Sequence, residues 1–346
     1  MTRDPPAVDD AASAHLYRAN VHHGKAAGRG ADGDTLSDLE QLVQASRLYY
    51  ELGETQSRVA ELLGVTRPQV SRLLKRARAE GIVEIRIIDR TSEASPAADE
   101  LRRRFGLHAV HLAPTVAGPE DVGRRMIGRL GAEVLRAAIR DGAVVGIGDG
   151  SSISAVADAL DEPTHQTGAT VLPLCGGYWF SGPAREPFRR VADGIGGTPL
   201  GLLAPGLVDD PATKASLYAH DGLRRILDLW GRLEVAAFGI GGPAWSEATF
   251  GAETCRDLES GAAVGELLIA PFDVDGRFLA DDLRARTIAF DARDLPKIPA
   301  RVGVAGGQAK VRPILGALRA GSLTTLVSDV RTAEAVVELD DAAAAA

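Results

Sequence analysis

The sequence has little cysteine, few aromatic residues and no long hydrophobic run. Its 2 cysteines in 346 residues are too few for a disulfide scaffold. No stretch approaches the roughly 18 consecutive apolar residues that a membrane-spanning helix needs, and the polar N-terminus lacks the apolar core of a signal peptide. We therefore expect a cytoplasmic protein with reduced thiols and no membrane segment.

Acidic residues outnumber basic residues, and the net charge of −8 argues against a general nucleic-acid binder. The composition, with 45% hydrophobic and 25% charged residues, is otherwise ordinary for a globular protein. The length predicts about two domains. Because a small basic module can be hidden in an acidic total, local charge decides whether the chain binds DNA. No set of His, Cys and acidic residues has metal-ligand spacing, so neither a metal nor a cofactor is expected.

The N-terminal region divides into a tail and a compact module. Residues 1–34 are rich in Ala, Asp, Gly and Pro without an apolar period, which predicts a disordered tail. The apolar pattern then predicts three helices and a strand, over residues 36–52, 55–63, 67–80 and 82–87. This order, with a tight turn before the third helix, is typical of a winged helix-turn-helix. We place that domain at residues 35–90.

The third helix reverses the overall charge, because it carries five basic residues and no acid between residues 67 and 78. Such a helix suits contact with DNA phosphates. Arg67 and Gln69, at its start, are residue types that read guanine and adenine edges in bidentate fashion. The alternative is a solvated basic helix face. The expected DNA-contacting residues are Thr55, Gln56, Thr66, Arg67, Gln69, Ser71, Arg72, Lys75 and Arg76.

Beyond residue 97, short β-rich runs that end in glycine or a turn alternate with helical segments. These runs cover residues 144–148, 171–177, 200–205, 235–242, 302–307 and 325–329. Near-continuous apolar strands separated by helices indicate a parallel sheet that is covered on both faces. We therefore expect an α/β class protein, with a larger Rossmann-like domain and a mostly parallel sheet over residues 97–340.

The first glycine-ended run is the leading candidate for a ligand site, because strands of an open α/β sheet direct their carboxyl ends at the ligand crevice. Residues 146–152 read GIGDGSS and precede a helix expected over 153–160. Glycine allows close backbone approach, and serine hydroxyls at a helix N-terminus can bind phosphate oxygens. As a dinucleotide fingerprint the motif is poor, because its third glycine is misplaced. A glycine turn that only closes strand onto helix is the alternative.

Residues 36–88 resemble the N-terminal domain of SorC-type (DeoR-like) sugar-binding transcriptional regulators. The match is carried by ETQ at 54–56, VAELLGVT at 59–66 and VSRLL at 70–74. It continues through the α/β region at AP 204–205, GIG 239–241, AVGE 263–266 and VAGGQAK 304–310. The resemblance implies an effector domain similar to sugar-phosphate isomerases and glucosamine-phosphate deaminases, which binds a sugar or sugar phosphate without turning it over.

The resemblance also points to individual ligand-binding residues. Asp149 stands where the family usually carries a tryptophan, and it would repel a phosphate or bind hydroxyls of an unphosphorylated sugar. Glu266 falls at the family's acidic position, where it accepts from ligand hydroxyls or forms a salt bridge. Lys310 follows a glycine pair by three residues and falls in the first turn of the next expected helix, which is unfavourable for a cation without a bound anion. The expected ligand-binding residues are Gly148, Asp149, Gly150, Ser151, Ser152, Gly176, Gly177, Glu266 and Lys310.

These observations predict a transcriptional regulator whose operator binding is controlled by a small carbohydrate or sugar phosphate. Recognition helices act in pairs on symmetric sites, so a homo-oligomer is expected, either a dimer or a tetramer. No catalytic residue is assigned. One alternative is a sugar-phosphate isomerase or deaminase with an appended head, using Asp149, Glu266 and Lys310. A constitutive architectural DNA-binding protein is another alternative, but it leaves the glycine-ended strands without a purpose.

Overall fold

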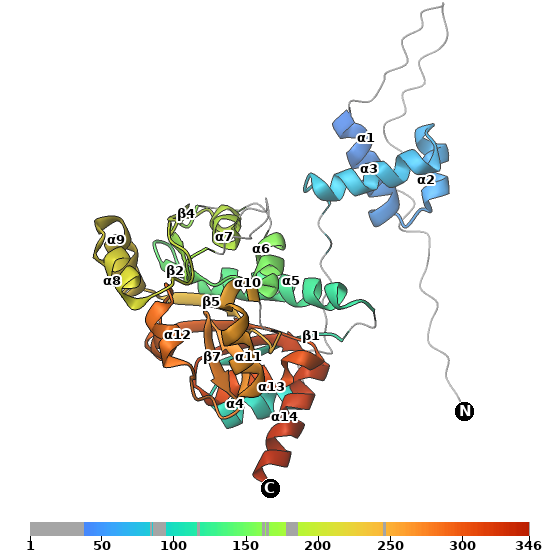
Figure 1. Ribbon diagram of the computed structural model, residues 1–346. Helices are drawn as coiled ribbons and strands as arrows, with labels where there is room; N and C mark the ends of the chain where they lie inside the picture. The colour runs from blue at the N-terminus through green and yellow to red at the C-terminus, as the bar shows by residue number, and fades with distance from the viewer. Residues whose placement is uncertain are drawn as a thin grey trace, which may run out of the picture. The chain divides into compact units, whose positions relative to one another are not determined.

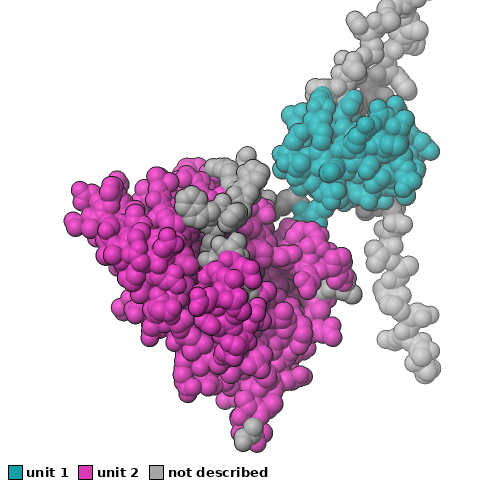
Figure 2. All heavy atoms as spheres, viewed as in Figure 1, with its two compact units in different colours: residues 1–88 teal, residues 89–346 magenta. Residues whose placement is uncertain are grey.

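A computed structural model describes residues 38–83, 85, 95–115, 118–160, 163, 166–177, 186–244 and 247–345. The chain forms two compact units, residues 1–88 and residues 89–346 (Figures 1 and 2). The tail expected over residues 1–34 lies outside the described residues.

The described part of the first unit is helical. Its helices are α1 (Asp38–Ser46), continued by the π-helix η1 (Arg47–Glu51), then α2 (Gln56–Leu63) and α3 (Arg67–Ala79). Gly64 has a left-handed backbone with φ 66° and ends α2, as the tight turn requires. The strand expected over 82–87 lies largely outside the described residues, and Ile82, Val83 and Ile85, which are described, belong to no strand.

Apolar side chains on one face of α3 hold the three helices together. Val70 and Leu74 are buried and stand one helical turn apart, as the sequence predicts for inward-facing positions. They pack with Ala45 of α1 and with Val59 and Ala60 of α2. Because these contacts occupy one side of α3, its basic side chains are left on the exposed side.

The second unit is built on a parallel seven-stranded sheet with the order β1-β9-β8-β5-β2-β3-β4. The strands are β1 (Ala109–Ala113), β2 (Val144–Ile147), β3 (Thr170–Pro173), β4 (Thr198–Pro199), β5 (Val235–Gly239), β8 (Ala300–Val304) and β9 (Thr325–Asp329). The expected parallel α/β sheet is therefore confirmed. The strand expected at 200–205 is wrong, because β4 ends at Pro199 and only Pro205 makes an isolated bridge, to Gly177.

Helices cover both faces of the sheet (Figure 1). Alternate strand residues such as Val145 and Ile147 face α5 (Glu120–Ala138), α6 (Ser151–Asp158) and α7 (Pro187–Ile195). Their neighbours, such as Leu172 and Phe238, face α4 (Pro96–Phe105), α9 (Asp221–Trp230), α13 (Val311–Arg319) and α14 (Val330–Ala344). This two-residue alternation of side-chain direction gives the sheet an apolar surface on each side.

The remaining elements lie around this sheet. They are the antiparallel hairpin β6 (Ala263–Leu267) and β7 (Ala270–Asp273), the helices α8 (Pro211–Ala219), α10 (Glu247–Phe250), α11 (Ala252–Ser260) and α12 (Asp281–Arg286), and the 3₁₀ helices η2 (Ala292–Lys297) and η3 (Gln308–Lys310). The hairpin is a strand pair that the sequence analysis does not expect.

A close helix crossing places the start of α6. A Cβ atom on Gly128 of α5 would lie only 2.6 Å from the backbone of Ala155 in α6. Glycine at this position therefore lets the two helices approach each other. The approach positions Ser151 and Ser152, which begin α6, at the carboxyl end of β2.

Candidate functional site

The strand order marks where a ligand crevice is expected. From β2 the chain proceeds through β3 and β4 toward one edge, whereas from β5 it proceeds to β8 and β9 toward the other. The neighbouring strands β2 and β5 thus form the topological switch point, where the loops after their carboxyl ends separate. Gly148 follows β2 and Ile240 follows β5. The glycine motif predicted from the sequence lies at this point.

A hollow of about 460 Å³ lies beside the switch point, at the carboxyl ends of β1, β2, β8 and β9. Ser151 and Ser152 border it from the start of α6, and Gly307 and Lys310 border it from η3. The first residues of α5 and α14 complete the wall. The starts of three α-helices and a 3₁₀ helix therefore meet at one hollow. Helix N-termini carry partial positive charge and attract anions. Two carboxylates, Glu120 and Asp329, also border the hollow, and Asp329 already caps α14 by accepting the N–H of Thr332 over 2.9 Å.

Three cationic side chains line the same hollow: Lys310, Arg124 of α5 and Arg331 of α14. Within the described chain, neither arginine forms a salt bridge. Arg331 lies in the first turn of α14, where the helix dipole disfavours a cation. Sequence reasoning missed both arginines. Arg331 shares one signal with Lys310, a cation at the start of a helix that follows a strand.

Lys310 joins this hollow to the end of β5. Its Nζ donates a hydrogen bond to the carbonyl oxygen of Ile240 over 2.8 Å. Burial lowers the pKa of the lysine, while the negative charge of Glu266 opposes that shift. The ammonium is therefore held in a partly desolvated position, where an additional anionic partner would stabilise its charged form.

Glu266 supplies an acidic counterpart. Its Oε2 accepts a hydrogen bond from the backbone N–H of Ile269 over 2.7 Å. Burial raises the pKa of this carboxyl and the nearby charge of Asp149 raises it further, whereas the Ile269 N–H and Lys310 lower it. Glu266 therefore interacts electrostatically with both Asp149 and Lys310. Two carboxylates beside an ammonium can bind ligand hydroxyls as well as a charged group.

The turn that carries Ile269 has an unusual backbone. Leu268 and Ile269 have φ values of 51° and 68°, in the left-handed region that β-branched residues rarely adopt. Both side chains are buried, and a Cβ on Gly148 would lie 3.4 Å from Leu268 and a Cβ on Gly206 would lie 3.0 Å from Ile269. The turn is thus wedged between two loops of the crevice. Sequence reasoning missed it, because Leu-Ile carries no turn signal.

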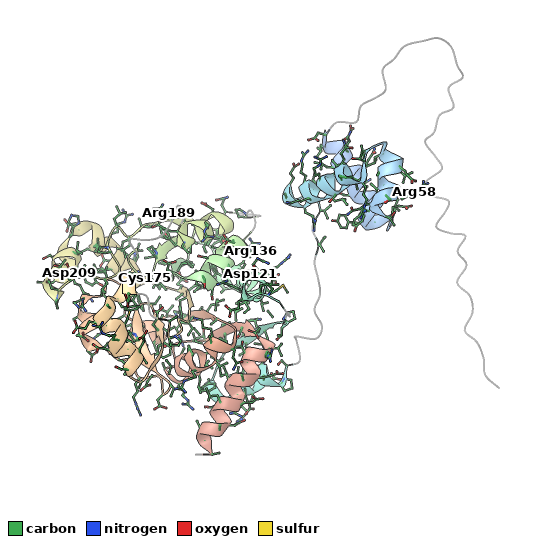
Figure 3. All side chains as sticks on the ribbon, turned by 45° about the vertical axis from the view of Figure 1, so that its right-hand side comes forward. Arg58, Asp121, Arg136, Cys175, Arg189 and Asp209 are labelled. Carbon is green, nitrogen blue, oxygen red and sulfur yellow. The ribbon has the colours of Figure 1, made fainter. Side chains whose placement is uncertain are left out.

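Cys175 lies in the interior of the second unit (Figure 3). Burial raises the pKa of its thiol, and the charges of Asp149 and Glu266 raise it further. A thiol with a raised pKa is a poor nucleophile. The residue is therefore structural.

The two glycines that follow Cys175 make close contacts with the backbone of residues 204–205. A Cβ on Gly176 would lie 2.3 Å from the carbonyl oxygen of Pro205, so only glycine fits there. Gly177 donates its N–H to the carbonyl of Ala204 over 3.0 Å. Neither glycine borders the hollow, and Gly148, Asp149, Gly150 and Glu266 do not border it either. Their ligand contacts stay predictions.

In the first unit, α3 exposes Arg67, Ser71, Arg72 and Lys75. Gln69 is exposed as well, but its Oε1 accepts from both the N–H and the hydroxyl of Thr66, at 2.7 and 2.8 Å. Gln69 therefore caps its own helix in the DNA-free protein.

Arg76 is also engaged within the protein. It forms salt bridges with Asp38 of α1 at 2.7 Å and with Glu80 at 2.9 Å. The hydrogen bonds to these two carboxylates raise the pKa of the guanidinium. Arg76 thus ties α3 to α1, and a phosphate would have to compete with both carboxylates.

The start of α2 faces the start of α3. A hollow of about 570 Å³ is bordered by Thr55 and Gln56 at the start of α2 and by Arg67 at the start of α3. Thr55 caps α2 by accepting a hydrogen bond from the N–H of Arg58. Tyr49, which the sequence analysis did not single out, borders the hollow too. Three side chains that the sequence predicts to contact DNA therefore border one hollow together with Tyr49.

No described helix combines the length and apolar character needed to cross a membrane. No three His, Cys, Asp or Glu side chains in the described segments are grouped so that they could hold a metal ion.

Comparison with known proteins agrees with both units. Residues 89–338 match the family described as "Putative sugar-binding domain", and residues 38–84 match the homeodomain-like domain family. The sorbitol operon regulator of Klebsiella pneumoniae is 27% identical over 87% of this chain and 98% of its own length. The deoxyribonucleoside regulator of Bacillus subtilis is 29% identical over 85% of this chain and 96% of its own length.

A third relative, the erythritol catabolism regulatory protein EryD of Brucella abortus, is 29% identical over 87% of this chain and 97% of its own length. The crystal structure of full-length SorC from Klebsiella pneumoniae matches with a TM-score of 0.71 at 26% identity, over 88% of this chain and all of that one. These relatives are named as regulators and not as enzymes, which argues against the isomerase or deaminase alternative. The chain belongs to the SorC family of sugar-binding, DNA-binding transcriptional regulators.

Proposed function

We propose that this regulator responds to an anionic carbohydrate, such as a sugar phosphate, which binds in the hollow beside the switch point. The observation that carries the proposal is the meeting of the start of α6, which no side chain caps, with three cations at one hollow, where the cations outnumber the two carboxylates Glu120 and Asp329. Ser151, Ser152 and Lys310 would bind the anionic group together with Arg124 and Arg331. A charge-assisted hydrogen bond of this kind contributes about 1.5–3 kcal/mol.

The carbohydrate part would extend toward Glu266 and Asp149, whose carboxylates accept hydrogen bonds from hydroxyl groups. A neutral polyol is the second candidate, because Asp149 places a negative charge near the site and two relatives are named for sorbitol and erythritol. The glycines at 148, 150, 176 and 177 would shape the backbone around either ligand. No cofactor or catalytic step is needed for either.

The DNA-binding function is assigned to residues 35–90 and effector binding to residues 97–340. Arg67, Gln69 and Ser71 would contact base edges, and Arg72 and Lys75 would contact phosphates, with Thr55, Gln56 and Thr66 supporting the helix starts. Gln69 would have to leave its cap on Thr66 to read a base. A homo-oligomer in the cytoplasm would present paired recognition helices to a symmetric operator.

A thermal-shift screen of matched pairs tests the effector proposal. Each sugar or polyol is compared with its own phosphate on the full chain, with Lys310→Ala as the control. A true effector raises the melting temperature as its concentration increases. At a free concentration of a hundred times its Kd, binding adds about 2.7 kcal/mol to the free energy of unfolding. We expect the phosphorylated member to act and the control variant to lose the effect. A response to the neutral members alone would favour the polyol.

A further inference from the structure

Helix α13 connects the crevice to the opposite end of the second unit. It begins directly after Lys310, and seven of its nine residues are buried. A Cβ on Gly265, beside Glu266, would lie 2.9 Å from Pro313, and a Cβ on Gly316 would lie 2.6 Å from the carbonyl of Asp273. Because the helix packs this tightly on the β6–β7 hairpin, a shift of its first turn is carried along its length.

Arg319, the last residue of α13, is held by an ionic network. Its guanidinium donates to the carbonyl of Val274 over 3.2 Å and to Asp340 of α14 over 2.9 Å. Asp340 accepts from Arg319 through Oδ1 and from Arg104 of α4 through Oδ2, the latter over 3.1 Å. The Asp340 carboxylate therefore joins the end of α13 to α4, and the neighbouring Asp341 holds Arg104 on α14 as well, over 2.6 Å.

The network is shielded from solvent. The side chains of Arg104, Asp340 and Arg319 are 19%, 19% and 22% exposed. Burial opposes the charge of Asp340, but hydrogen bonds from Arg319 and Arg104 outweigh it and hold the pKa of the carboxyl below its ordinary value. Ion pairs at this depth are screened less by salt than exposed pairs.

Helix α4 is the first described helix after the first unit, which ends at residue 88. Any displacement passed along the chain to the DNA-binding unit must therefore go through α4. Besides the ionic contact, α4 is docked by the buried Leu101. The apolar contact holds the helix on the sheet, and the ionic contact connects it to α13.

We propose that the bridge Arg319–Asp340–Arg104 is the relay that passes a shift of Lys310 and α13 to α4, and thereby links the crevice to the DNA-binding unit. The inference rests on the proposed function, because it assigns the relay to the effector signal. Its test needs neither effector nor operator. It therefore fails or succeeds separately from the assignment of the ligand.

The test is a double-mutant cycle on the full chain, read out by hydrogen exchange of the α4 amides. Asp340→Asn should accelerate this exchange roughly 5- to 30-fold, as expected for the loss of one or two kcal/mol of docking. Lys310→Gln removes the bond to Ile240 at the far end of α13 and should also accelerate exchange in α4. In the Asp340→Asn background, Lys310→Gln should add nothing.

Sites this far apart without a shared partner normally have additive effects. Additive acceleration, or no effect of Lys310→Gln on α4, would overturn the relay. Arg319→Gln should reproduce Asp340→Asn, since it breaks the same bridge from the α13 side. The matched control is Asp291→Asn, which breaks the pair with Arg284 at a carboxylate that is 28% exposed and should leave α4 exchange unchanged.

Discussion

The carboxylate of Glu266 accepts the N–H of Ile269 over 2.7 Å, and Ile269 presents this N–H from a left-handed backbone with φ 68°. A β-branched residue in this conformation is strained. The burial of its side chain among Phe250, Cys255 and Leu283 offsets that strain. The turn thus holds an acidic side chain of the crevice in place at a local energetic cost, as is common at functional sites.

Two separate variants of Ile269, one with alanine and one with glycine, distinguish the backbone strain from the side-chain packing. Both Ile269→Ala and Ile269→Gly lose the buried side chain, which costs about 2–5 kcal/mol for an Ile→Ala change. Only glycine also relieves the left-handed backbone, so it should be more stable than alanine by about 1–2 kcal/mol. Urea unfolding of the two variants measures the difference. An alanine variant as stable as the glycine variant would show that the turn is unstrained.

Neutralising Glu266 should give a pH-dependent gain in stability. Burial raises the pKa of this carboxyl, so the folded state holds its proton more tightly than the unfolded state. The contribution of this group to the free energy of unfolding is fully present below the ordinary glutamate pKa, and it is lost as the pH rises through the raised pKa of the folded state. Glu266→Gln should therefore raise Tm at neutral pH, and the gain should vanish in acid.

Thermal melts over a pH series check this expectation for Glu266→Gln, with Glu334→Gln on the exposed surface of α14 as the control. A gain that persists unchanged at low pH would mean that burial of the charge is not its cause.

Two substitutions in the crevice distinguish the ligand classes. Lys310→Ala should weaken binding of the effector roughly 10- to 150-fold, the equivalent of one charged hydrogen bond. Asp149→Asn should tighten binding of a sugar phosphate, because a like charge leaves the site, and should weaken binding of a neutral polyol. Calorimetry with the ligand found by thermal shift measures both. Unchanged affinity in both variants would place the site elsewhere.

If α3 is the recognition helix, substitutions in it should cause two kinds of DNA-binding defect. Arg67→Ala should relax specificity and cost about 1–3 kcal/mol at one base pair. Lys75→Ala should weaken binding to all DNA sequences alike and reduce the slope of log binding constant against log salt concentration by about 1. Gel-shift titrations over a salt series separate the two, with Arg225→Ala in the second unit as the control. Operator affinity that is unchanged in both α3 variants would contradict the assignment of α3.

The oligomer contact is expected in the second unit. A fragment that begins near residue 95 should then remain a dimer or larger species, because it keeps the parallel sheet and the helices that cover it. Light scattering on the fragment and on the full chain tests this. A monomeric fragment beside an oligomeric full chain would move the contact to the first unit.

The features that the sequence by itself determined are those set by neighbours along the chain. Gly64 ends α2 and Pro68 fits the first turn of α3, because both depend only on local backbone geometry. The basic residues of α3 and most of the apolar strands of the sheet can likewise be recognised along the sequence. Helix 153–160 was expected two residues too late, since the serines that begin α6 also resemble turn residues.

Only the tertiary structure decided which distant residues meet. Arg124 and Arg331 border one hollow because β1 pairs with β9, and no local pattern specifies that strand order. The same holds for Arg76, whose partner Asp38 lies on another helix. The left-handed turn at Leu268 and Ile269 contradicts local propensity and persists because burial of both side chains outweighs it. Long-range packing therefore determined the composition of the crevice.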